Sequence, residues 1–445
     1  MVISNFVNEA TLFFKLLRTD FNEVGALFPT SSISAKALCS ELRRHRGTKR
    51  VLEVGAGTGA ITAELVKWIG PGDQLVVCEL NPVFADFLRN RFRNEPEFKA
   101  VSAQSQIYEG SVLDLPADAQ FDYIVSTIPF NNCPADFVGA VFAHYQRLLK
   151  AAGVLSYIEY IAGRTLKQFL GTDSTVAEVQ ALLAEQRQHF EFRKEIVVRN
   201  IPPAWIHHLR FGQATAADAS ALGALKENAR MGIGPLGLDV DAVPVVAGLL
   251  GLAAWLRRRT PASRLWQWLA LSALLVGIFF RDPRRRVLTN DRLAYAASDG
   301  VVLKVETLRD PRFGEEEWLR VAVFLSIFDV HLNRAPVGGK VVEILHEDGG
   351  HASANLESAE HNVAQYTVLE TAHGRCIVAQ RSGLIARRIV NRSKVGMLLA
   401  QGDKFGLIRF GSRTDIYLPA ATYFSRVKKG DRVWGGETVI AEMKG

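Results

Sequence analysis

The spacing of apolar and polar residues divides the chain into four parts. Residues 1–211 alternate apolar runs of strand length with helix-like patterns, which predicts β–α units around a parallel sheet. Residues 212–239 are rich in alanine and glycine and predict a linker. Residues 240–286 contain two long apolar runs, and residues 287–445 contain short β-rich runs separated by Gly, Asp and Asn. The last part therefore predicts a mostly antiparallel β domain.

The two long apolar runs, Val240–Leu256 and Leu265–Phe280, are near the lower length limit for crossing a membrane. If both crossed, the arginine clusters after each run would face opposite sides, which the positive-inside tendency disfavours. A hairpin that dips into one leaflet keeps both clusters cytoplasmic. A helical hairpin buried inside the protein is the alternative. We favour the membrane, because Trp255, Trp266 and Trp268 lie near the ends of the runs, as in interfacial aromatic belts.

The composition shows where the positive charge of the chain is concentrated. The chain has 445 residues, 48% of them hydrophobic and 22% charged, which is ordinary for two or three globular domains. Its net charge of +7 equals that of the stretch from Arg257 to Arg286, where eight arginines accompany one acid, Asp282. Nucleic acid is one interpretation of a basic patch. A membrane surface explains the arginines and the apolar runs together, so no nucleic-acid partner is expected.

The cysteines indicate a reducing compartment and no zinc site, because they are scattered and form no Cys-x-x-Cys pair. We expect no metal, and the N-terminus lacks the basic region of a signal peptide. The four cysteines are Cys39, Cys78, Cys133 and Cys376.

A glycine turn marks the first candidate site. Residues 50–62 predict a strand, a turn containing Gly55, Gly57 and Gly59, and the start of a helix. Glycines let backbone N–H groups approach a ligand, and a helix N-terminus favours negative charge. Such a turn fits a nucleotide-like cofactor, and by itself NAD would suit it equally well.

Three acids around this turn favour S-adenosylmethionine. Glu53 precedes the glycines within the strand, and Glu79 ends the second strand, where it can accept hydrogen bonds from both ribose hydroxyls. Asp114 follows the next strand, near an adenine amino group. Solvated strand ends are the plain alternative for Glu79 and Asp114. The order resembles the class I methyltransferases, which implies an α/β Rossmann-like methyltransferase domain over residues 1–211.

A proline turn after the next strand occupies the place of that family's substrate-adjacent motif. Amine-methylating relatives often carry Asn/Asp-Pro-Pro-Tyr there, whereas this chain has Thr127, Ile128, Pro129 and Phe130. The variant resembles the bacterial phospholipid N-methyltransferases and the rRNA adenine dimethylases. We expect Pro129 to turn the chain so that backbone carbonyls and Phe130 face the methyl donor. A purely structural turn is the alternative.

The N-terminal segment resembles the amphipathic start of the phospholipid enzymes. It contains Phe13–Arg18 and Val24–Ser32. Such a segment can lie on a lipid surface, and it would equally suit a helical lid over the donor site.

A Gly-Ser pair, Gly411-Ser412, marks the second candidate site. It lies between two strand-like runs, and upstream are the blocks Ala297–Gly300 and Phe324–Pro336. From about Gly232 to Gly445, this order resembles the short, archaeal-type phosphatidylserine decarboxylases. The resemblance implies a mostly β decarboxylase domain at residues 287–445. It also implies self-cleavage between Gly411 and Ser412, which converts the serine into a pyruvoyl group that serves as the electron sink for decarboxylation. The β chain (1–411) and α chain (412–445) would remain associated.

Self-cleavage requires a base for the serine hydroxyl and for its α-proton. The resemblance assigns this role to His331, held by Asp299 in the manner of activated hydroxyls. Many relatives carry a second histidine where this chain has Arg334. Either His331 acts in both self-processing and turnover, or Arg334 takes an electrostatic role in one of them. The run from Phe279 to Arg285 also recurs in this family, with aromatic residues at the hydrocarbon edge and arginines on lipid phosphates.

Three functions remain in competition. The first is a bifunctional enzyme on the cytoplasmic face of a bacterial membrane, which makes phosphatidylethanolamine and then N-methylates it. The second keeps the decarboxylase but gives the methyltransferase another acceptor, such as rRNA or a small amine. The third is a non-enzymatic membrane lipid-binding protein, which the intact Gly411, Ser412, Asp299 and His331 argue against.

Overall fold

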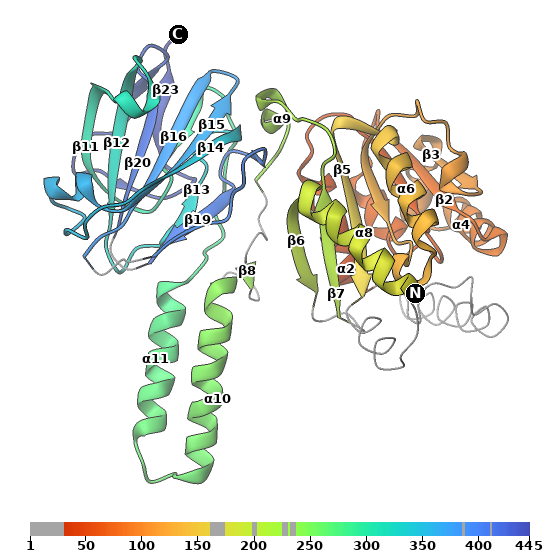
Figure 1. Cartoon of the computed structure of the whole chain (residues 1–445), viewed down its shortest axis with the longest axis horizontal. Coiled ribbons are helices and arrows are strands. Elements are labelled where there is room, and N and C mark those ends of the chain that lie inside the picture. Colours follow the sequence, from red (N-terminus) through yellow and green to blue (C-terminus); the bar gives the residue numbers. More distant parts are fainter. Residues whose placement is uncertain are drawn as a thin grey trace. The chain divides into compact units, whose positions relative to one another are not determined.

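The computed structural model describes residues 31–160, 174–197, 203–224, 230–231, 237–384, 388–409 and 412–445. The chain forms two compact units, Met1–Ala214 and Thr215–Gly445, which we call unit 1 and unit 2 (Figure 1). The predicted segment Phe13–Arg18 and residues 24–30 of the predicted segment Val24–Ser32 lie outside the described residues, and so does Gly411.

Unit 1 is a seven-stranded sheet with helices packed along it. The strand order is β3-β2-β1-β4-β5-β7-β6. The first five strands pair in parallel, whereas β7 and β6 join antiparallel. The order reverses between β1 and β4, and in such sheets ligands bind at this reversal, outside the carboxyl ends of the strands. The predicted α/β Rossmann-like fold is confirmed.

The strands of unit 1 are β1 (Arg50–Val54), β2 (Gln74–Glu79), β3 (Ser105–Glu109), β4 (Phe121–Ser126), β5 (Leu149–Tyr160), β6 (Glu191–Val197) and β7 (Ala204–Leu209). Its α-helices are α2 (Ser32–Leu38), α3 (Thr62–Leu65), α4 (Pro82–Asn94), α5 (Pro96–Lys99), α6 (Ala135–Leu148) and α8 (Ser174–Phe190). Its 3-10 helices are η1 (Leu42–Arg44), η2 (Val66–Trp68), η3 (Ser102–Gln104), η4 (Val112–Asp114) and η5 (Phe130–Asn132).

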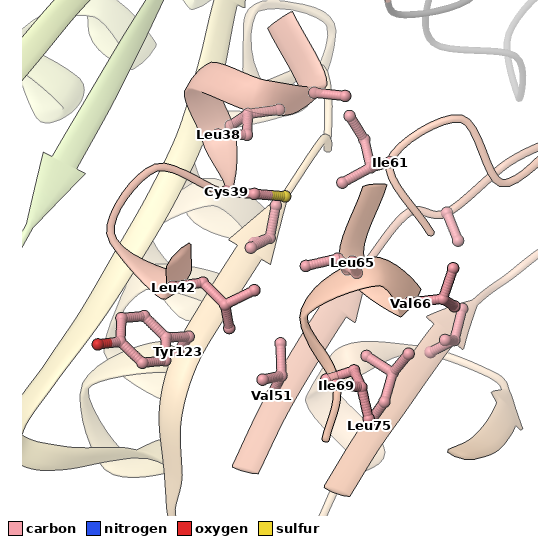
Figure 2. Packing of buried hydrophobic residues seen from close by; sticks show 14 of the residues in the cluster. Leu38, Cys39, Leu42, Val51, Ile61, Leu65, Val66, Ile69, Leu75 and Tyr123 are labelled. Carbon is pink, nitrogen blue, oxygen red and sulfur yellow. The ribbon is translucent and has the colours of Figure 1, made fainter. Parts of the chain in front are cut away.

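The central strands of unit 1 are apolar on both faces because both faces are covered. Val51 of β1 packs into one cluster with Leu38, Ile61 and Leu65 (Figure 2). The next residue, Leu52, points to the opposite cluster, beneath α6. Period-2 alternation therefore places every residue of such a strand in a core, which explains the near-continuous apolar runs in the sequence.

Unit 2 contains the predicted antiparallel β domain. An eight-stranded sheet has the order β18-β14-β15-β16-β20-β12-β11-β22, and two smaller sheets have the orders β13-β19-β17 and β10-β23-β21. The bounds of the eight-stranded sheet are β18 (Leu398–Leu399), β14 (Gly339–Glu347), β15 (Ala364–Thr371), β16 (Gly374–Arg381), β20 (Ser412–Pro419), β12 (Glu317–Leu325), β11 (Gly300–Arg309) and β22 (Arg432–Val433). Those of the smaller sheets are β13 (Leu332–Arg334), β19 (Lys404–Ile408), β17 (Ile389–Asn391), β10 (Leu293–Tyr295), β23 (Val439–Met443) and β21 (Tyr423–Ser425).

The segment predicted as a linker contains ordered structure. Helix α9 (Ala216–Ser220) begins with a capping box between Thr215 and Asp218, and it packs against β14 within unit 2. A two-stranded ribbon of β8 (Arg230–Met231) and β9 (Leu238–Asp239) follows. The remaining short helices of unit 2 are η6 (Val240–Ala242), η7 (Pro311–Phe313) and η8 (Glu357–His361).

The two apolar runs form a helical hairpin of α10 (Val243–Arg259) and α11 (Leu265–Phe279) (Figure 1). The helical stretch Val240–Arg259 is long and apolar enough to cross a membrane, with a mean hydropathy of 1.5 and only 11% of its apolar window buried. Trp255 and Trp268 are 55% and 65% exposed. The described part of the chain therefore does not bury this hairpin, which argues against an internal helical pair.

Candidate active sites

The glycine turn of unit 1 joins β1 to α3 in the conformation that the sequence predicts. Gly55, Gly57 and Gly59 all have positive φ, at 77°, 55° and 83°. A Cβ on Gly59 would lie 2.8 Å from a methyl carbon of Leu88, so close packing excludes a side chain there. A Cβ on Gly57 would meet no atom of the described residues within 4 Å. The middle of the turn is therefore open to a ligand.

Glu79 lies at the end of β2 and is hydrogen-bonded to this turn. One carboxylate oxygen accepts a hydrogen bond from the Gly57 backbone N–H at 2.7 Å, and the other accepts one from the Asn81 N–H at 2.9 Å. Burial raises the pKa of the Glu79 carboxyl above its ordinary value. The structure thus brings Glu79 to the glycines, where a ribose would bind. Asp114 lies in η4 after β3 and is exposed.

Glu53 is the most unusual acid of unit 1. Its side chain is fully buried in β1, and neither carboxylate oxygen has a hydrogen-bond partner within the described residues. Burial raises its pKa to about 8. At this pKa the carboxyl is mostly protonated at pH 7, and the neighbouring Thr62 opposes the rise. Its place directly before the glycine turn fits a ligand whose polar groups supply the hydrogen bonds that the carboxyl lacks.

The proline turn after β4 differs from the prediction in the direction of the Phe130 ring. The Thr127 hydroxyl donates a hydrogen bond to the Gly55 carbonyl at 2.5 Å, which ties this turn to the glycine turn. The Phe130 ring, however, is buried in the core, with its centroid 5.1 Å from that of Phe142 and 5.7 Å from that of Tyr157. The prediction that Phe130 faces the methyl donor is therefore wrong, because the apolar ring gains more from the core beneath α6. Pro129 and the adjacent backbone remain candidates for the acceptor side.

In unit 2, Ser412 is the first residue of β20 and directly follows the undescribed pair 410–411. Its side chain is fully buried, and its hydroxyl has no hydrogen-bond partner in the part of the chain that the structure describes. Along β12 it pairs with Leu325. The preceding strand, β19, belongs to another sheet, so the predicted cleavage site lies where the chain crosses from one sheet to the next.

His331 lies just before β13, which pairs with β19. The Ile408 N–H donates a hydrogen bond to the His331 carbonyl at 3.2 Å, so the histidine lies opposite the end of the strand that leads to Ser412. The Nδ1 atom of its ring is 2.9 Å from the Asp329 carbonyl oxygen. Because a carbonyl only accepts, Nδ1 carries the proton and Nε2 is the basic nitrogen of the neutral ring. Burial lowers the pKa of His331 to about 4, so the ring is neutral at pH 7.

Asp299 does not hold His331 in the way that the sequence analysis expects. Its two carboxylate oxygens accept hydrogen bonds from Arg285 at 2.6 Å and from the Gly435 N–H at 2.8 Å. Burial raises the Asp299 pKa, and the Arg285 guanidinium opposes that rise. The hydrogen bonds of Asp299 within the described residues come from these two donors, and none comes from His331.

The end of α11 and the residues that follow it contact this site. The Phe279 ring packs on His331, with centroids 4.2 Å apart, and Arg281 donates a hydrogen bond to the Phe328 carbonyl at 2.5 Å. The sequence predicts the aromatic residues of this run at the hydrocarbon edge and its arginines on lipid phosphates. Phe279, Arg281 and Arg285 instead have partners within unit 2. Arg284 and Arg286 are exposed, as that expectation requires.

Arg334 belongs to a buried ion-pair cluster that the sequence analysis did not foresee. One guanidinium nitrogen donates to the Gly402 carbonyl at 3.1 Å, and another is 3.5 Å from Asp282. Asp282 also pairs with Lys404 at 2.5 Å. Burial lowers the pKa of Arg334. The signal in the sequence was Asp282, the single acid among eight arginines, which marks a charge that needs an internal partner.

Comparison with known proteins identifies both parts. The family described as phosphatidylserine decarboxylase matches residues 273–441, and the family described as methyltransferase domain matches residues 51–153. The phosphatidylserine decarboxylase proenzyme of Carboxydothermus hydrogenoformans is 40% identical over 183 residues, which cover 40% of this chain and 86% of the relative. That of Nocardia farcinica is 41% identical over 215 residues, which cover 47% of this chain and 86% of the relative.

Similarity to solved structures is weaker. The O-methyltransferase TomG of Streptomyces achromogenes, solved in complex with SAM, aligns with 41% of this chain and 82% of its own, at 19% identity and a TM-score of 0.33. Rv0187, solved with its cofactor bound, aligns with 42% of this chain and 84% of its own, at 20% identity and a TM-score of 0.32.

The two family matches define a fused enzyme, a decarboxylase joined to a methyltransferase. The chain belongs to the phosphatidylserine decarboxylase family. Phosphatidylserine is its substrate, and it is made as a proenzyme. The cofactors of the two kinds of domain are a pyruvoyl group and S-adenosylmethionine, and both resemblances seen in the sequence are confirmed.

Proposed function

We propose that the chain cleaves itself between Gly411 and Ser412, decarboxylates phosphatidylserine, and then N-methylates the phosphatidylethanolamine that it makes. The observation that carries the first half is Ser412, a buried hydroxyl without a partner among the described residues, at the start of the strand that follows the proposed bond. A structural serine at such a place would hydrogen-bond to a neighbour, because leaving a buried hydroxyl unpaired costs about 1–3 kcal/mol.

His331 is the proposed base for this cleavage. Its Nδ1–H is held by the Asp329 carbonyl, which orients Nε2 as the proton acceptor. The apolar surroundings, including the Phe279 ring, keep the imidazole neutral, and only the neutral form takes a proton from Ser412. Asp299 acts indirectly, because it holds the Arg285 side chain and the Gly435 backbone N–H by hydrogen bonds.

A pyruvoyl group at position 412 fits the structure, because that residue already lies enclosed between sheets. When formed, it supplies the electron sink that decarboxylation requires. The residues of this chain exclude water around it and hold a neutral imidazole for proton transfer, while the buried Arg334 adds a fixed positive charge. We therefore assign His331 to both processing and turnover, and Arg334 to the electrostatic role.

In unit 1, the residues that would hold S-adenosylmethionine are Glu53, Glu79 and the backbone around Gly57, with Asp114 toward the adenine. Two observations support this assignment: the buried carboxyl of Glu53 has no hydrogen-bond partner among the described residues, and the glycine turn is open. Thr127 ties the acceptor-side turn to the donor turn and so sets the spacing between the two substrates.

The proposed methyl acceptor is phosphatidylethanolamine. Its support is the fusion itself, since unit 2 makes a lipid with a primary amine and unit 1 is a methyltransferase. Another amine or rRNA is the second candidate, which the departure from the amine-methylating motif at Thr127–Phe130 keeps open.

We propose that the hairpin α10–α11 and the exposed arginines at its loop and exit bind the cytoplasmic face of the membrane. Arg257, Arg258 and Arg259 are exposed where the hairpin turns, and Arg257 lies over the Trp266 ring at 5.2 Å. Apolar helices insert into the bilayer, and arginines bind anionic headgroups.

Lipid mass spectrometry of cells that express the chain tests this function. The wild type should deplete phosphatidylserine and accumulate mono-, di- or trimethylated phosphatidylethanolamine. Ser412→Ala should leave phosphatidylserine unchanged, yet still methylate phosphatidylethanolamine supplied by the host. Loss of phosphatidylserine in cells with Ser412→Ala would contradict the pyruvoyl assignment. Decarboxylation without any methylated lipid would favour the second acceptor class.

A further inference from the structure

A group of buried ion pairs lies on the face of β20 opposite to the Ser412 side chain. Successive residues of a strand point to opposite faces, so Arg413 and Asp415 share the face that Ser412 does not use. Arg413 and Asp415 are 3% and 0% exposed. Their side chains contact each other, since Arg413 Nε donates a hydrogen bond to Asp415 Oδ1 at 2.6 Å. Two buried charges of opposite sign therefore follow directly after Ser412.

Each of these two residues is held by a side chain from an earlier part of the chain. Asp415 Oδ2 accepts a hydrogen bond from Arg381 Nε of β16 at 2.8 Å, and both side chains are fully buried. Arg413 Nη2 donates to Glu360 Oε1 of η8 at 3.1 Å. The Glu360 carboxylate also accepts two hydrogen bonds from Arg320 of β12, both at 2.8 Å. These five side chains, which we call the β20 network, tie β20 to its two neighbouring strands.

Further hydrogen bonds fix the β-chain side of the network. The other two guanidinium nitrogens of Arg381 donate to the Glu360 carbonyl at 2.7 Å and to the Tyr366 hydroxyl at 3.0 Å. Although burial raises the pKa of Glu360, the hydrogen bond from Arg320 and the charge of Arg413 lower it to about 2. Glu360 is therefore ionised at neutral pH, and its charge is available to hold the arginines.

The two charged residues of β20 stand at its start. Farther along the same face, Tyr417 packs with Trp318 and Phe313 in an apolar cluster. A buried ion pair is often no more stable than apolar side chains of the same volume, so stability alone does not explain the charges. Charge-assisted hydrogen bonds add geometric specificity that apolar contacts lack. The network therefore fixes the position of the beginning of β20.

The proposed cleavage turns the beginning of β20 into the end of a chain. Chain ends are poorly ordered unless they are tied down. Ser412 pairs with Leu325 of β12, whereas β16 pairs with β20 only from Arg413 onward in the described register. Backbone pairing thus restrains the first residue of the new chain from one side. The side chains of the next residues are then the nearest further restraint.

We propose that the β20 network holds the start of the α chain in place after self-cleavage, with Arg381 and Glu360 as positioning residues. Both belong to the β chain (1–411), whereas their partners Asp415 and Arg413 belong to the α chain (412–445). They act on residue 412 only through these partners, and they touch neither substrate nor the reacting atoms. Before cleavage the chain is continuous at residue 412, so the cleavage step does not depend on the network. This inference rests on the proposed cleavage site.

The test uses Glu360→Gln in the full chain, with Glu306→Gln as the matched control. Glu360 and Glu306 both pair with Arg320, and their side chains are 31% and 24% exposed. Within the described structure, Glu360 alone of the two also contacts the α chain, through Arg413. Glutamine keeps the shape of the side chain and removes its charge. The two variants therefore weaken the pairing of Arg320 alike and differ at Arg413.

Hydrogen exchange at residues 413–416 measures whether the chain end is held. In the cleaved protein, Glu360→Gln should raise the exchange rate of these amides about tenfold, the effect of losing one hydrogen bond to a charged group. In uncut Ser412→Ala protein, the same change should alter the exchange rate by less than about twofold, because the chain is continuous there. Glu306→Gln should leave the exchange rate unchanged in both.

Enzyme kinetics separate positioning from folding. Self-cleavage of Glu360→Gln, followed by mass spectrometry, should proceed within about twofold of the wild-type rate. Decarboxylation of phosphatidylserine in mixed micelles should lose about tenfold in kcat with KM nearly unchanged, because a displaced reacting group slows the chemical step. Glu306→Gln should match the wild type in both measurements.

Arg413→Lys is the second variant, because lysine keeps the charge but lacks the planar fork that reaches Asp415 and Glu360 together. It should raise exchange in the cleaved protein only, as Glu360→Gln does. Wild-type exchange and turnover in both variants would overturn the inference. Equal rises in cleaved and uncut protein, or the same losses in Glu306→Gln, would overturn it as well. Cleavage that persists in Ser412→Ala would instead reject the proposed cleavage site.

Discussion

The two units each keep a buried polar side chain without a hydrogen-bond partner in the described structure, and the two cases differ in what surrounds them. Glu53 of unit 1 precedes a glycine turn whose centre is open among the described residues, since a Cβ on Gly57 would meet none of their atoms within 4 Å. Ser412 of unit 2 is enclosed between sheets, where its strand is buried along its whole length. A polar side chain at an open site can hydrogen-bond to a ligand from solution. A polar side chain at an enclosed site can interact only with groups of the chain itself.

This difference explains why the two halves of one lipid enzyme depend on charge in opposite ways. In unit 1 burial raises the pKa values of the acids Glu53 and Glu79, so each favours its neutral form more than a free carboxyl does, and each can still hydrogen-bond to a ligand. In unit 2 the ionised groups near the site are already paired, Asp299 with Arg285 and Asp282 with Lys404. His331, the proposed base, is the exception, because burial lowers its pKa and keeps the ring neutral. Changes in unit 2 should therefore affect the chemical step, and changes in unit 1 should affect binding.

The largest effect should come from His331→Ala, which removes the proposed base. We expect self-cleavage to slow about 10³-fold, within the range usual for losing a general base. In the wild type, cleavage should fall as the pH drops through about 4, because the protonated imidazole takes no further proton. Precursor processing followed by mass spectrometry measures both. His346→Ala is the control, since that side chain is exposed and should cleave normally.

His331 also makes a prediction about stability. Its folded pKa of about 4 lies below the unfolded value of about 6.5, so between these pH values the unfolded chain binds more protons. The free energy of unfolding therefore rises with pH across this window and loses about 3 kcal/mol as the pH falls from 6.5 to 4. Denaturant unfolding of His331→Ala should lack this component. An unchanged pH dependence would contradict a neutral, buried His331.

The next effect concerns the membrane. Deleting residues 243–276 and closing the gap with a Gly-Ser loop removes the hairpin but keeps Phe279, which packs on His331. We expect co-sedimentation with phosphatidylserine vesicles to fall about 100-fold, while self-cleavage continues. A deletion that extends through Phe279 should slow cleavage as well, because the apolar neighbour of the imidazole is lost. Full vesicle binding by the shorter deletion would show that other surfaces anchor the protein.

The sequence revealed the elements and the reactive residues more readily than the contacts between them. Strand and hairpin patterns depend on local periodicity, so the Rossmann-like sheet and the paired apolar helices were predictable. The Gly411-Ser412 pair and the glycine turn were recognisable because such chemistry requires short, fixed spacings. The partners of Asp299 and Asp282 were not predictable, since Gly435 and Lys404 lie more than 100 residues away along the chain. Phe130 was misjudged because a motif position does not say whether a ring faces the ligand or the core.

A smaller effect is expected from Glu79→Ala in unit 1. This change removes the carboxylate proposed to bind the ribose hydroxyls, and a charge-assisted hydrogen bond is worth about 1.5–3 kcal/mol. The dissociation constant for S-adenosylmethionine, measured by isothermal titration, should rise roughly 10- to 150-fold. Glu109→Ala is the matched control, since Glu109 pairs with Glu79 across the sheet but is exposed. Equal weakening by both variants would reject the specific role of Glu79.

The smallest effect should come from Asp299→Asn in unit 2, because Asp299 acts on the reaction only through other groups. Asparagine keeps the shape and one acceptor, but it loses the charge that pairs with Arg285 at 2.6 Å. The neighbouring residue, Ser298, is hydrogen-bonded to Thr414 of β20 at 2.5 Å, so a looser turn at Asp299 shifts the strand that begins with Ser412. We expect self-cleavage to slow about tenfold, well short of the loss in His331→Ala. Glu437→Gln removes the other, more exposed partner of Arg285 and should cleave within twofold of wild type. If Asp299→Asn abolished cleavage as completely as His331→Ala, Asp299 would have to contact the reacting groups directly during the reaction, and the indirect role assigned here would be wrong.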